Sequence, residues 1–456
     1  MGYHRLPEEP LRRSGGLLSQ AEPDDIVAPA GSAFDPGAGD AFVRHARFVE
    51  ANLKRNYTAN FVHGVLGMTG FRLIYAPTII PAYLLAITGS AAAVGLGTAL
   101  LQLGATISPI LSGARIEHRS HILPYSVRTG SMMRVAILGL ALAGWLLTGQ
   151  TLIVVTLALF LMLGFFNGAQ RVAFQMIMAK VIPIDRRGRL QGYRNLAGGL
   201  IAAVLAWFAG KYFIADDWLG NGYATTFLFA FVLTSAGLLV LQLMIREPPA
   251  PVSRPVIPLR ERIRQFPQLL EDRDFARFIA AQAFATAFRI GGPFFTVYAG
   301  QRLGLSGALI GGLSFAFLGA DTLSNLLWGP LGDRFGFRLV YILSLASAGA
   351  GVLLLMLSGT TLPIYVAFVL LGIGGSGWML SATTMVLEFG AHEDIPMRLA
   401  FVTTAEGAVA AAGPLLAGLL VAAAGFAPLF ALVLSGIGIS LALMTFAVRE
   451  PRGRVH

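Results

Sequence analysis

Gly329-Pro-Leu-Gly-Asp-Arg-Phe-Gly-Phe-Arg338 is a charged, glycine-rich segment that separates two apolar stretches of the chain. A related segment, Gly113-Ala-Arg-Ile-Glu-His-Arg119, follows an apolar stretch in the first half. Both contain the pattern Gly-x-Arg-x-x-x-Arg, which begins at Gly332 in one copy and at Gly113 in the other. A pattern that recurs at matching places indicates that the chain consists of two related halves.

Other spacings repeat between the halves and agree within one residue. They are Gln102 to Gly113 and Asp321 to Gly332, Arg72 to Ser90 and Arg289 to Ser306, and Leu163 to Arg189 and Leu371 to Arg398. Agreement of all these spacings is improbable by chance. Duplicated halves of this kind, related about the membrane normal, are typical of transporters.

Long apolar stretches make up most of the chain. Of its 456 residues, 55% are hydrophobic and only 13% are charged, and the mean hydropathy is +0.68. A soluble chain normally carries about 25% charged residues, and a bilayer-spanning helix needs about 20 mostly apolar residues. The sequence therefore predicts an all-α membrane protein with twelve transmembrane helices in two six-helix halves, related by pseudo-twofold symmetry. The predicted spans are 60–88, 91–112, 122–148, 151–180, 189–214, 222–246, 274–303, 306–331, 337–358, 362–389, 397–424 and 426–448.

Lys and Arg residues are distributed unevenly between the two sides of the predicted bundle. Of the 34, 26 lie in the tails and in alternate loops, whereas the opposite loops hold only Lys211 and Arg302. Cytoplasmic loops of membrane proteins carry an excess of Lys and Arg. We therefore expect a multi-pass protein of the inner (cytoplasmic) membrane with both termini in the cytoplasm.

Several functional classes find no support in the sequence. Nucleic-acid binding would need a basic, aromatic-containing soluble domain, and none is present. The chain contains no cysteine, which excludes disulfides and thiolate metal sites. Neither a nucleotide-binding loop nor a Ser/His/Asp set at one depth occurs. We expect no enzyme activity, no metal site and no cofactor.

The chain divides into five predicted segments. They are a cytoplasmic N-terminal tail at 1–58, a six-helix half at 59–246, a cytoplasmic linker at 247–273, a second six-helix half at 274–449 and a C-terminal tail at 450–456. No signal peptide precedes the first span, which should serve as an uncleaved insertion signal. Residues 1–40 lack periodicity and are expected to be disordered. Residues 41–58 fit either an amphipathic helix on the membrane surface or a helical extension of the first span.

The segment 329–338 resembles the cytoplasmic loop motif of the major facilitator superfamily, Gly-x-Leu-Ala/Gly-Asp-Arg-x-Gly-x-Arg. With the twelve spans, the six-plus-six division and the repeat, the resemblance covers residues 60–450. It implies a transporter whose spans 1, 4, 7 and 10 line a central cavity. It says nothing about the solute.

The resemblance also implies a cytoplasmic gate that closes and is released during transport. Two glycines permit a tight turn, and Asp333 can lie near the amides that begin the eleventh span. Arg334 and Arg338 can pair with acids such as Glu388, Glu393 or Asp394. The predicted gate residues are Gly332, Asp333, Arg334, Gly336, Arg338, Arg115, Arg119 and Arg398. A static turn whose arginines only set topology is the alternative.

The first half departs from this pattern. Ala114 replaces the acid of the loop motif, and Glu117 replaces its second glycine. The fifth span also lacks the Gly-Pro element of the superfamily's proton-driven drug exporters, whereas Gly413-Pro414 occurs in the eleventh span. The gate is therefore expected to be asymmetric, and drug export is not supported.

Arg72 and Arg289 lie near the middle of the first and seventh spans, at matching places in the two halves. An ionised side chain at this depth is costly and usually faces a partner or a wet cavity. Prolines and glycines next to both arginines predict broken helices, which is where transporters bind solutes. A guanidinium suits a carboxylate or phosphate. We predict that both arginines bind an anion, and the alternative is that they brace the halves by pairing with Asp321 or Glu406.

Further polar residues lie within the predicted spans. Asn167 and Arg171 share one face of the fourth span, Tyr75 follows Arg72 by one turn, and Trp378 lies in the tenth span. The predicted substrate-binding residues are Arg72, Tyr75, Asn167, Arg171, Arg289 and Trp378. Asp321 and Glu406 are candidates for proton coupling or for switching salt bridges.

The sequence therefore predicts a secondary active transporter of a small organic anion that works by alternating access. A proton symporter and an antiporter both fit. The predicted partners are the solute, the lipid bilayer and, in a coupled mechanism, protons, with no nucleic acid. The alternatives are a drug exporter and a non-transporting protein of this fold, such as a receptor, an assembly factor or a handler of lipids or pigments.

Overall fold

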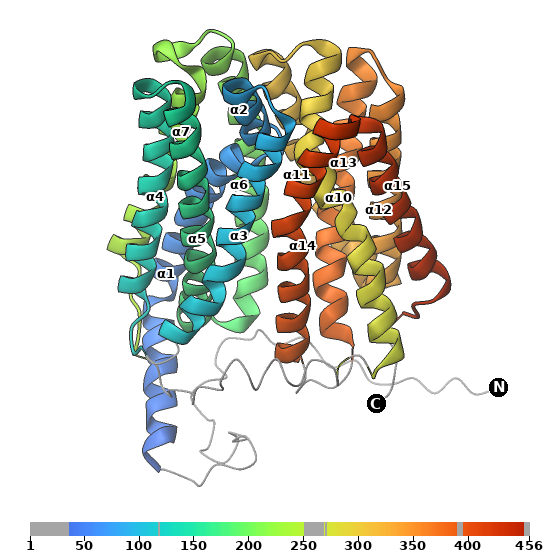
Figure 1. The fold of residues 1–456 in the computed structure, drawn as a ribbon. Helices are drawn as coiled ribbons and strands as arrows, with labels where there is room; N and C mark the ends of the chain where they lie inside the picture. The colour runs from blue at the N-terminus through green and yellow to red at the C-terminus, as the bar shows by residue number, and fades with distance from the viewer. Residues whose placement is uncertain (1–35, 117–118, 250–268, 270, 390–394, 451–456) are drawn as a thin grey trace, which may run out of the picture.

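The structure is a computed structural model that describes residues 36–116, 119–249, 269, 271–389 and 395–450. These residues form a bundle of helices that run between two opposite ends of the molecule (Figure 1). Residues 1–35 of the predicted N-terminal tail (1–58) and residues 250–268 of the predicted linker (247–273) lie outside the described part of the chain.

The first half contains a broken first span, five further long helices and two short helical turns. These elements are α1 (Pro36–Tyr75), α2 (Ile79–Thr88), α3 (Ala91–Ile116), α4 (Leu123–Leu146), α5 (Gly149–Val181), α6 (Ile184–Phe208), the π-helical turn η2 (Ala209–Ile214), the 3-10 turn η3 (Trp218–Gly220) and α7 (Gly222–Met244). The second half contains α10 (Arg273–Leu303), α11 (Gly307–Phe335), α12 (Phe337–Leu357), α13 (Thr361–Glu388), α14 (Ile395–Ala424) and α15 (Phe426–Phe446).

Among the described residues, ten helices are long and apolar enough to cross a membrane, and the bent pair of α1 and α2 makes eleven. Helix α10 is not in that set, because Gln282, Arg289 and the run Gly291-Gly292-Pro293 lower its apolarity. It nevertheless lies within the bundle and takes the place of the seventh predicted span (Figure 1). The predicted all-α membrane fold with two six-helix halves is confirmed.

The same helix pairs pack in both halves. In the first half α3 and α4 each pack on α5, and α1 packs on α7; in the second half α11 and α12 each pack on α13, and α10 packs on α15. The two halves meet along α3 with α14 and along α6 with α11. The repeated spacings predict a pseudo-twofold axis between the halves. Rotation about this axis would superimpose one of these interfaces on the other.

Glycines allow the two halves to approach closely. A Cβ at Gly95 of α3 would clash with the Pro414 carbonyl oxygen of α14, and a Cβ at Gly210 of η2 would clash with the Cα of Gly311 of α11. Small residues at helix interfaces let backbones pack tightly in membranes. The halves therefore form two backbone-to-backbone contacts.

The first span bends by 40° between α1 and α2. Pro81 has no N–H and cannot bond to the carbonyl of Pro77; the hydroxyl of Thr296 in α10 donates to that oxygen instead, at 2.8 Å. The predicted break in the seventh span is wrong, since α10 continues through Gly291-Gly292-Pro293. A helix can retain a proline at the loss of one backbone hydrogen bond.

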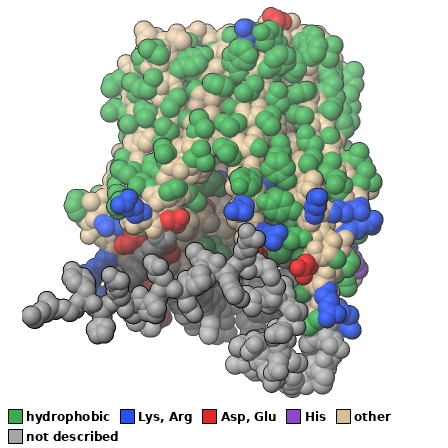
Figure 2. Space-filling model, turned by 180° about the vertical axis from the view of Figure 1, so that it is seen from behind, with side chains coloured by type: hydrophobic (Ala, Val, Ile, Leu, Met, Phe, Trp, Pro, Cys, Tyr) green, Lys and Arg blue, Asp and Glu red, His purple; other side chains and the backbone are tan. Residues whose placement is uncertain are grey.

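The two ends of the bundle differ in charge. We call the end where α1 begins and α15 finishes the tail face, and the opposite end, which carries the turn between α2 and α3, the loop face. Lys and Arg side chains gather in a band toward the tail face in Figure 2, whereas the surface above is mostly hydrophobic. This is the pattern from which the sequence analysis predicts a cytoplasmic tail face.

Helix α1 is 40 residues long and continues the first span beyond the tail face of the bundle (Figure 1). Of the two interpretations of residues 41–58, the structure shows the helical extension. Its described side chains include the exposed Arg44, Arg47 and Phe48.

Candidate functional site

A cavity of about 410 Å³ lies between the two halves. Its wall includes Tyr75 of α1 and Gln102 of α3 from the first half, and Arg289 of α10 and Glu406 of α14 from the second. Its volume falls within the roughly 300–1,000 Å³ that is typical of small-molecule sites. Both halves therefore contribute polar groups to one cavity.

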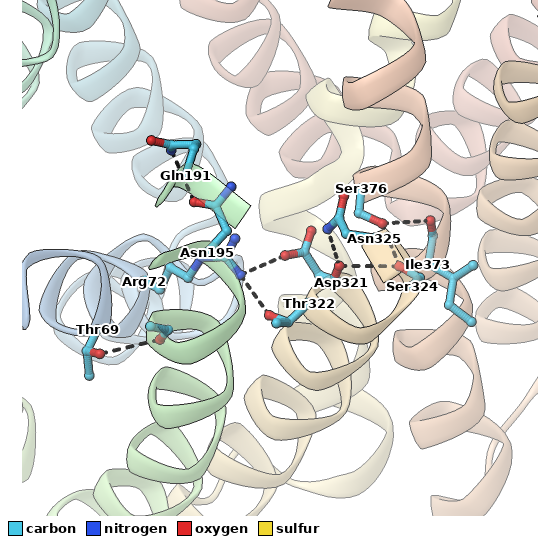
Figure 3. A network of polar contacts seen from close by, with 11 residues as sticks. Thr69, Arg72, Gln191, Asn195, Asp321, Thr322, Ser324, Asn325, Ile373 and Ser376 are labelled. Atoms are coloured by element: carbon cyan, nitrogen blue, oxygen red, sulfur yellow. Dashed lines mark hydrogen bonds and ion pairs between the residues drawn. The ribbon is translucent and has the colours of Figure 1, made fainter. Parts of the chain in front are cut away.

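Arg72 crosses from one half to the other. Its Nη1 donates to Oδ2 of Asp321 at 2.8 Å and to Oγ1 of Thr322 at 3.0 Å (Figure 3). The two charged side chains are only 24% and 21% exposed. Of the two predicted roles for Arg72, this conformation contains the brace between the halves.

Asp321 is held in place by its own half. The amide of Asn325 and the hydroxyl of Ser324 donate to the Asp321 backbone carbonyl, at 2.6 and 3.3 Å (Figure 3). Ser324 also shares a 2.6 Å hydrogen bond with Ser376 of α13. The carboxylate of Asp321 lines the cavity, so the ion pair with Arg72 lies at its edge.

Arg289 faces Glu406 within the second half. Its Nη1 lies 3.8 Å from Oε2 of Glu406, beyond hydrogen-bond distance. Gln282 donates from Nε2 to the other carboxylate oxygen of Glu406 at 2.8 Å and accepts from Trp378 Nε1 at 3.2 Å. Glu406 is thus fixed by the Gln282–Trp378 chain and only loosely paired with Arg289.

The guanidinium of Arg289 is the least satisfied charged group at the cavity. No described residue forms a hydrogen bond with it, although its side chain is only 34% exposed. Pro293 lies one turn later and lacks the N–H that would bond the Arg289 carbonyl in a regular helix. The N–H groups of Arg289 are thus partly dehydrated and without a hydrogen-bond partner among the described residues. Arg289 is therefore the residue of the cavity best suited to bind an anion.

The remaining predicted binding residues are divided between the cavity wall and its surroundings. Tyr75 and Trp378 line the cavity, and the Asn167 amide donates to the Tyr75 hydroxyl at 3.1 Å from outside the wall. Arg171 is exposed and is close enough to Arg289 for the two charges to repel. Arg72 and Arg171 are not among the residues of the wall.

Sequence reasoning missed two residues that complete these contacts. Thr322 accepts from Arg72 and follows directly after Asp321. Gln282 lies two turns before Arg289 in α10 and reaches both Glu406 and Trp378. The helical spacing of Gln282 and Arg289 indicated a shared face, but not that Glu406 lies on the same side.

Contacts between the halves close the cavity toward the loop face. The hydroxyls of Thr78 and Ser314 lie 2.5 Å apart, and Thr296 donates to the Pro77 carbonyl. At the middle of the bundle, Thr106 of α3 donates to the Gly407 carbonyl of α14 at 3.3 Å. The ion pair of Arg72 and Asp321 lies in the same set of inter-half contacts.

At the tail face, the loop motif of the second half holds three helix ends together. Gly336 has φ +90° and lies against the carboxylate of Glu450, so that a Cβ there would clash. Arg338 donates to the carbonyls of Met444 and Thr445, at 2.8 and 2.6 Å, at the end of α15. A cation at a helix C-terminus is favourable.

The described contacts of Arg338 are with the end of α15 and with Glu450. Arg338 uses the carbonyls at the end of α15, and its backbone N–H lies 3.3 Å from Glu450. Glu393 and Asp394 lie outside the described residues. Arg334 packs its guanidinium over the Phe335 ring at 5.1 Å, and Asp333 and Gly332 lie on the last turn of α11.

The first half contains a corresponding tail-face contact, to which a lysine is added. The carboxylate of Glu247 accepts from the backbone N–H groups of Ile122 and Leu123 at the start of α4, and pairs with Lys180 at 2.6 Å. Arg119 donates to the Arg115 carbonyl and lies over the Tyr125 ring. The described contacts of Arg119 and Glu247 remain within the first half.

The last predicted gate residue, Arg398, is buried near the start of α14. It lies over the Phe275 ring at 4.9 Å and 3.8 Å from Asp272, the residue that caps α10. These contacts join α14 to α10 inside the second half. In the part of the chain that the structure describes, no group of three or more His, Asp or Glu could hold a metal ion.

A protein-family model described as the Major Facilitator Superfamily matches residues 62–320 and 277–456. The chain belongs to the major facilitator superfamily. It is thus a multi-pass transport protein of this superfamily and not an enzyme, as the loop motif predicts. No curated protein matches the chain.

Solved structures of superfamily transporters have the same fold. A mutant of the nucleoside transporter NupG has 14% identity and a TM-score of 0.67, with 85% of this chain and 98% of that chain covered. A D-xylose-proton symporter has 16% identity and a TM-score of 0.66, covering 89% and 100%. The human organic anion transporter MFSD10 has 15% identity and a TM-score of 0.59, covering 86% and 99%. At such identities the likeness shows the fold alone.

Proposed function

We propose that this protein is a secondary active transporter of a small organic anion. The observation that carries the proposal is Arg289, whose guanidinium lines the cavity between the halves without a hydrogen bond to any described residue. A charge at this depth costs about 2.5–3.5 kcal/mol on insertion scales, so a function for it is expected. A carboxylate or similar anion would satisfy its donors in a bidentate arrangement.

The solute also contacts the first half in this proposal. Tyr75 and Trp378 line the same cavity as Arg289, while Asn167 orients Tyr75 through its amide. Arg171 adds a positive charge near Arg289, which favours the approach of an anion. Arg72 joins the site when its pair with Asp321 opens.

Alternating access follows from where the halves touch. The loop-face contacts of Thr78 with Ser314 and of Thr296 with Pro77 must open for the cavity to reach the other side. The Arg72–Asp321 pair must break in the same movement, because it joins the halves. The tail-face residues of the loop motif, with Arg115, Arg119 and Arg398, would form the gate that closes in exchange. Access then alternates by rocking of two rigid halves.

Proton coupling is supported by the charge balance at the cavity. Arg289 and Glu406 neutralise each other at present. An anion that binds Arg289 takes over that charge and leaves the carboxylate of Glu406 without its counter-ion, and a proton taken up together with the anion would restore the balance of charge. Glu406 is therefore the proposed site of the coupled proton, and Asp321 takes the corresponding role when it separates from Arg72.

The proposed setting is the inner membrane, with the tail face in the cytoplasm. The band of Lys and Arg near the tail face supports this orientation.

The test is uptake of organic anions into proteoliposomes that contain the full chain, with Arg289→Gln as the variant. We expect uptake by the natural protein and loss of uptake in Arg289→Gln. Arg128→Gln is the matched control, because Arg128 is an exposed arginine of α4 away from the cavity. An anion at about 100 times its dissociation constant should also add about 2.7 kcal/mol to the stability of the purified protein.

Other results would favour the alternatives. Uptake of cations only would support a drug exporter and exclude the anion. Absence of transport for anions, cations and neutral solutes, with normal behaviour of the Arg289 variant in cells, would support a non-transporting protein of this fold.

A further inference from the structure

The position that corresponds to Asp321 in the first half is Gln102. Each lies 11 residues before the first glycine of the repeated loop pattern, and Arg72 and Arg289 also occupy matching positions. Arg72 pairs with Asp321 across the halves. The pseudo-twofold relation would pair Arg289 with residue 102, and α10 does pack against α3. A neutral amide stands where the second acid would be, which explains why one arginine is braced and the other is open.

Few other side-chain hydrogen-bond donors of the wall remain available to a solute. Thr98 and Thr383 each use their hydroxyl proton on a backbone carbonyl one turn earlier, at 2.9 Å. Gln282 is bonded at both ends of its amide. The side chain of Gln102 has no hydrogen bond to a described residue, and the Tyr75 hydroxyl accepts from Asn167 and keeps its own proton. Arg289, Gln102 and Tyr75 are thus the open donors.

The rest of the wall is largely aromatic and aliphatic. Phe288 and Trp378 meet at 90° with ring centroids 6.3 Å apart, and Phe295 lies 6.1 Å from Phe288. Phe317 and Phe368 also line the cavity. Perpendicular rings accommodate a flat apolar group, which can stack on one ring and meet the other edge-on.

From these three observations we infer the substrate class of the proposed transport: a monovalent organic anion with a flat, apolar body. This inference rests on the proposed function and makes it specific. The carboxylate or equivalent group binds Arg289 with Gln102 and Tyr75, and the body lies against Trp378 and Phe288. A sugar has no flat apolar body that could lie against these rings.

In this conformation, with Arg72 paired to Asp321, a second negative charge has no counter-ion at the wall. Arg72 is used by Asp321, and Arg171 is not a wall residue. Phthalate and phenyl phosphate therefore bind more weakly than benzoate, although all three contain the same ring. Benzamide keeps the shape of benzoate and lacks its charge, so it isolates the contribution of Arg289.

The experiment measures the thermal midpoint of the purified full chain with benzoate, benzamide, phthalate, phenyl phosphate, acetate and xylose at matched concentrations. We expect benzoate to raise the midpoint at concentrations at least about tenfold lower than any other member. Trp378→Phe and Phe317→Leu each reduce the preference for benzoate over acetate. Trp207→Phe, at an exposed tryptophan outside the cavity, leaves that preference unchanged.

Any other result of this experiment contradicts a specific part of the inference. If phthalate, phenyl phosphate, acetate or xylose acts as strongly as benzoate, or if no member acts, the substrate class is wrong. Whether the protein transports an anion at all is then decided separately, by the uptake assay with Arg289→Gln. If benzamide acts and no anion does, both the class and the anion are wrong.

Discussion

Two arginines at matching positions of the repeat have different surroundings. Arg72 is hydrogen-bonded to Asp321 and Thr322 of the opposite half. Arg289 lies 3.8 Å from Glu406 of its own half, with no hydrogen bond to a described residue. Duplication supplied both halves with a central arginine, and the acid across the interface is present only once. The comparison teaches that the repeat braces one side of the cavity and leaves the other side open to a solute.

The largest effect is expected from restoring the missing acid. Gln102→Glu places a carboxylate where the symmetry relation pairs residue 102 with Arg289, so the arginine gains a second acidic partner besides Glu406 and the charge available to an anion is lost. Uptake of the anion should fall at least about tenfold, equivalent to about 1.4 kcal/mol, while the thermal midpoint rises or stays constant. Proteoliposome uptake and thermal unfolding measure the two quantities.

The control for this change is Gln102→Asn, which shortens the side chain without adding charge. Equal losses in the Glu and Asn variants would show that the amide itself, and not the new charge, matters. Full activity of Gln102→Glu would contradict the pairing of residue 102 with Arg289.

Loss of the braced arginine should affect stability. Arg72→Gln leaves the Asp321 carboxylate partly dehydrated without its cation, and a hydrogen bond to a charged group contributes about 1.5–3 kcal/mol. We expect the unfolding free energy to fall by that amount. Combining Arg72→Gln with Asp321→Asn should recover part of the loss, because no unpaired charge then remains. Additive losses in the double variant would mean that the two side chains do not interact.

A smaller effect is expected at Thr322. Thr322→Val keeps the shape of the side chain and removes the 3.0 Å hydrogen bond from Arg72. The expected destabilisation is about 0.5–1.5 kcal/mol, measured by thermal unfolding. Since Thr322 also lies against Gly199 of α6, Thr322→Ser is the companion variant that keeps the hydroxyl. If Thr322→Ser is as destabilising as Thr322→Val, packing rather than hydrogen bonding is responsible.

The smallest change in stability is expected at the open arginine. The Arg289–Glu406 pair is longer than a hydrogen bond and partly exposed, and such pairs contribute about 0–1 kcal/mol. Arg289→Gln should therefore unfold within about 1 kcal/mol of the natural protein even though its uptake is lost. A loss of stability as large as that of Arg72→Gln would remove the distinction between the two arginines.

Much of the fold could be predicted because the bilayer restricts the chain to few solutions. Spanning segments must be apolar helices that satisfy their own backbone groups, so hydropathy located the helices and Lys and Arg distinguished the faces. Helix breaks were predicted less well than helix positions, because a proline inside a long span does not always break the helix. Pro77 and Pro81 accompany a real break in the first span, whereas Pro293 lies inside the continuous α10. The difference depends on neighbouring helices, which a local pattern does not contain.

The candidate site could be predicted only in part. Depth along a span follows from sequence, so Arg72, Arg289, Asp321 and Glu406 were recognisable as intramembrane charges. Their pairing depends on which helices are adjacent and on the direction that each side chain takes around its helix. The sequence suggested one site formed by both arginines. In this conformation Arg289 lies at the cavity wall, whereas Arg72 forms an ion pair at the edge of the cavity.

A second repeated signal was present and was missed. Arg246-Glu247-Pro248 follows α7, and Arg449-Glu450-Pro451 follows α15. The two glutamates approach the starts of α4 and α12 respectively, where backbone amides favour an anion. Glu247 also pairs with Lys180. Comparison of the sequence after the last span of each half would have identified both.

The length of α1 has a mechanical consequence. Its 40 residues correspond to a rod of about 60 Å, roughly twice the hydrocarbon thickness of a bilayer. About half of this rod projects as an arm fixed to the span that contains Arg72. If the first half tilts by about 10°, the tip of an arm about 30 Å long is displaced by about 5 Å. Since the chain has no native cysteine, a single spin label at Val43 would convert a small rotation inside the membrane into a displacement that is measurable in water.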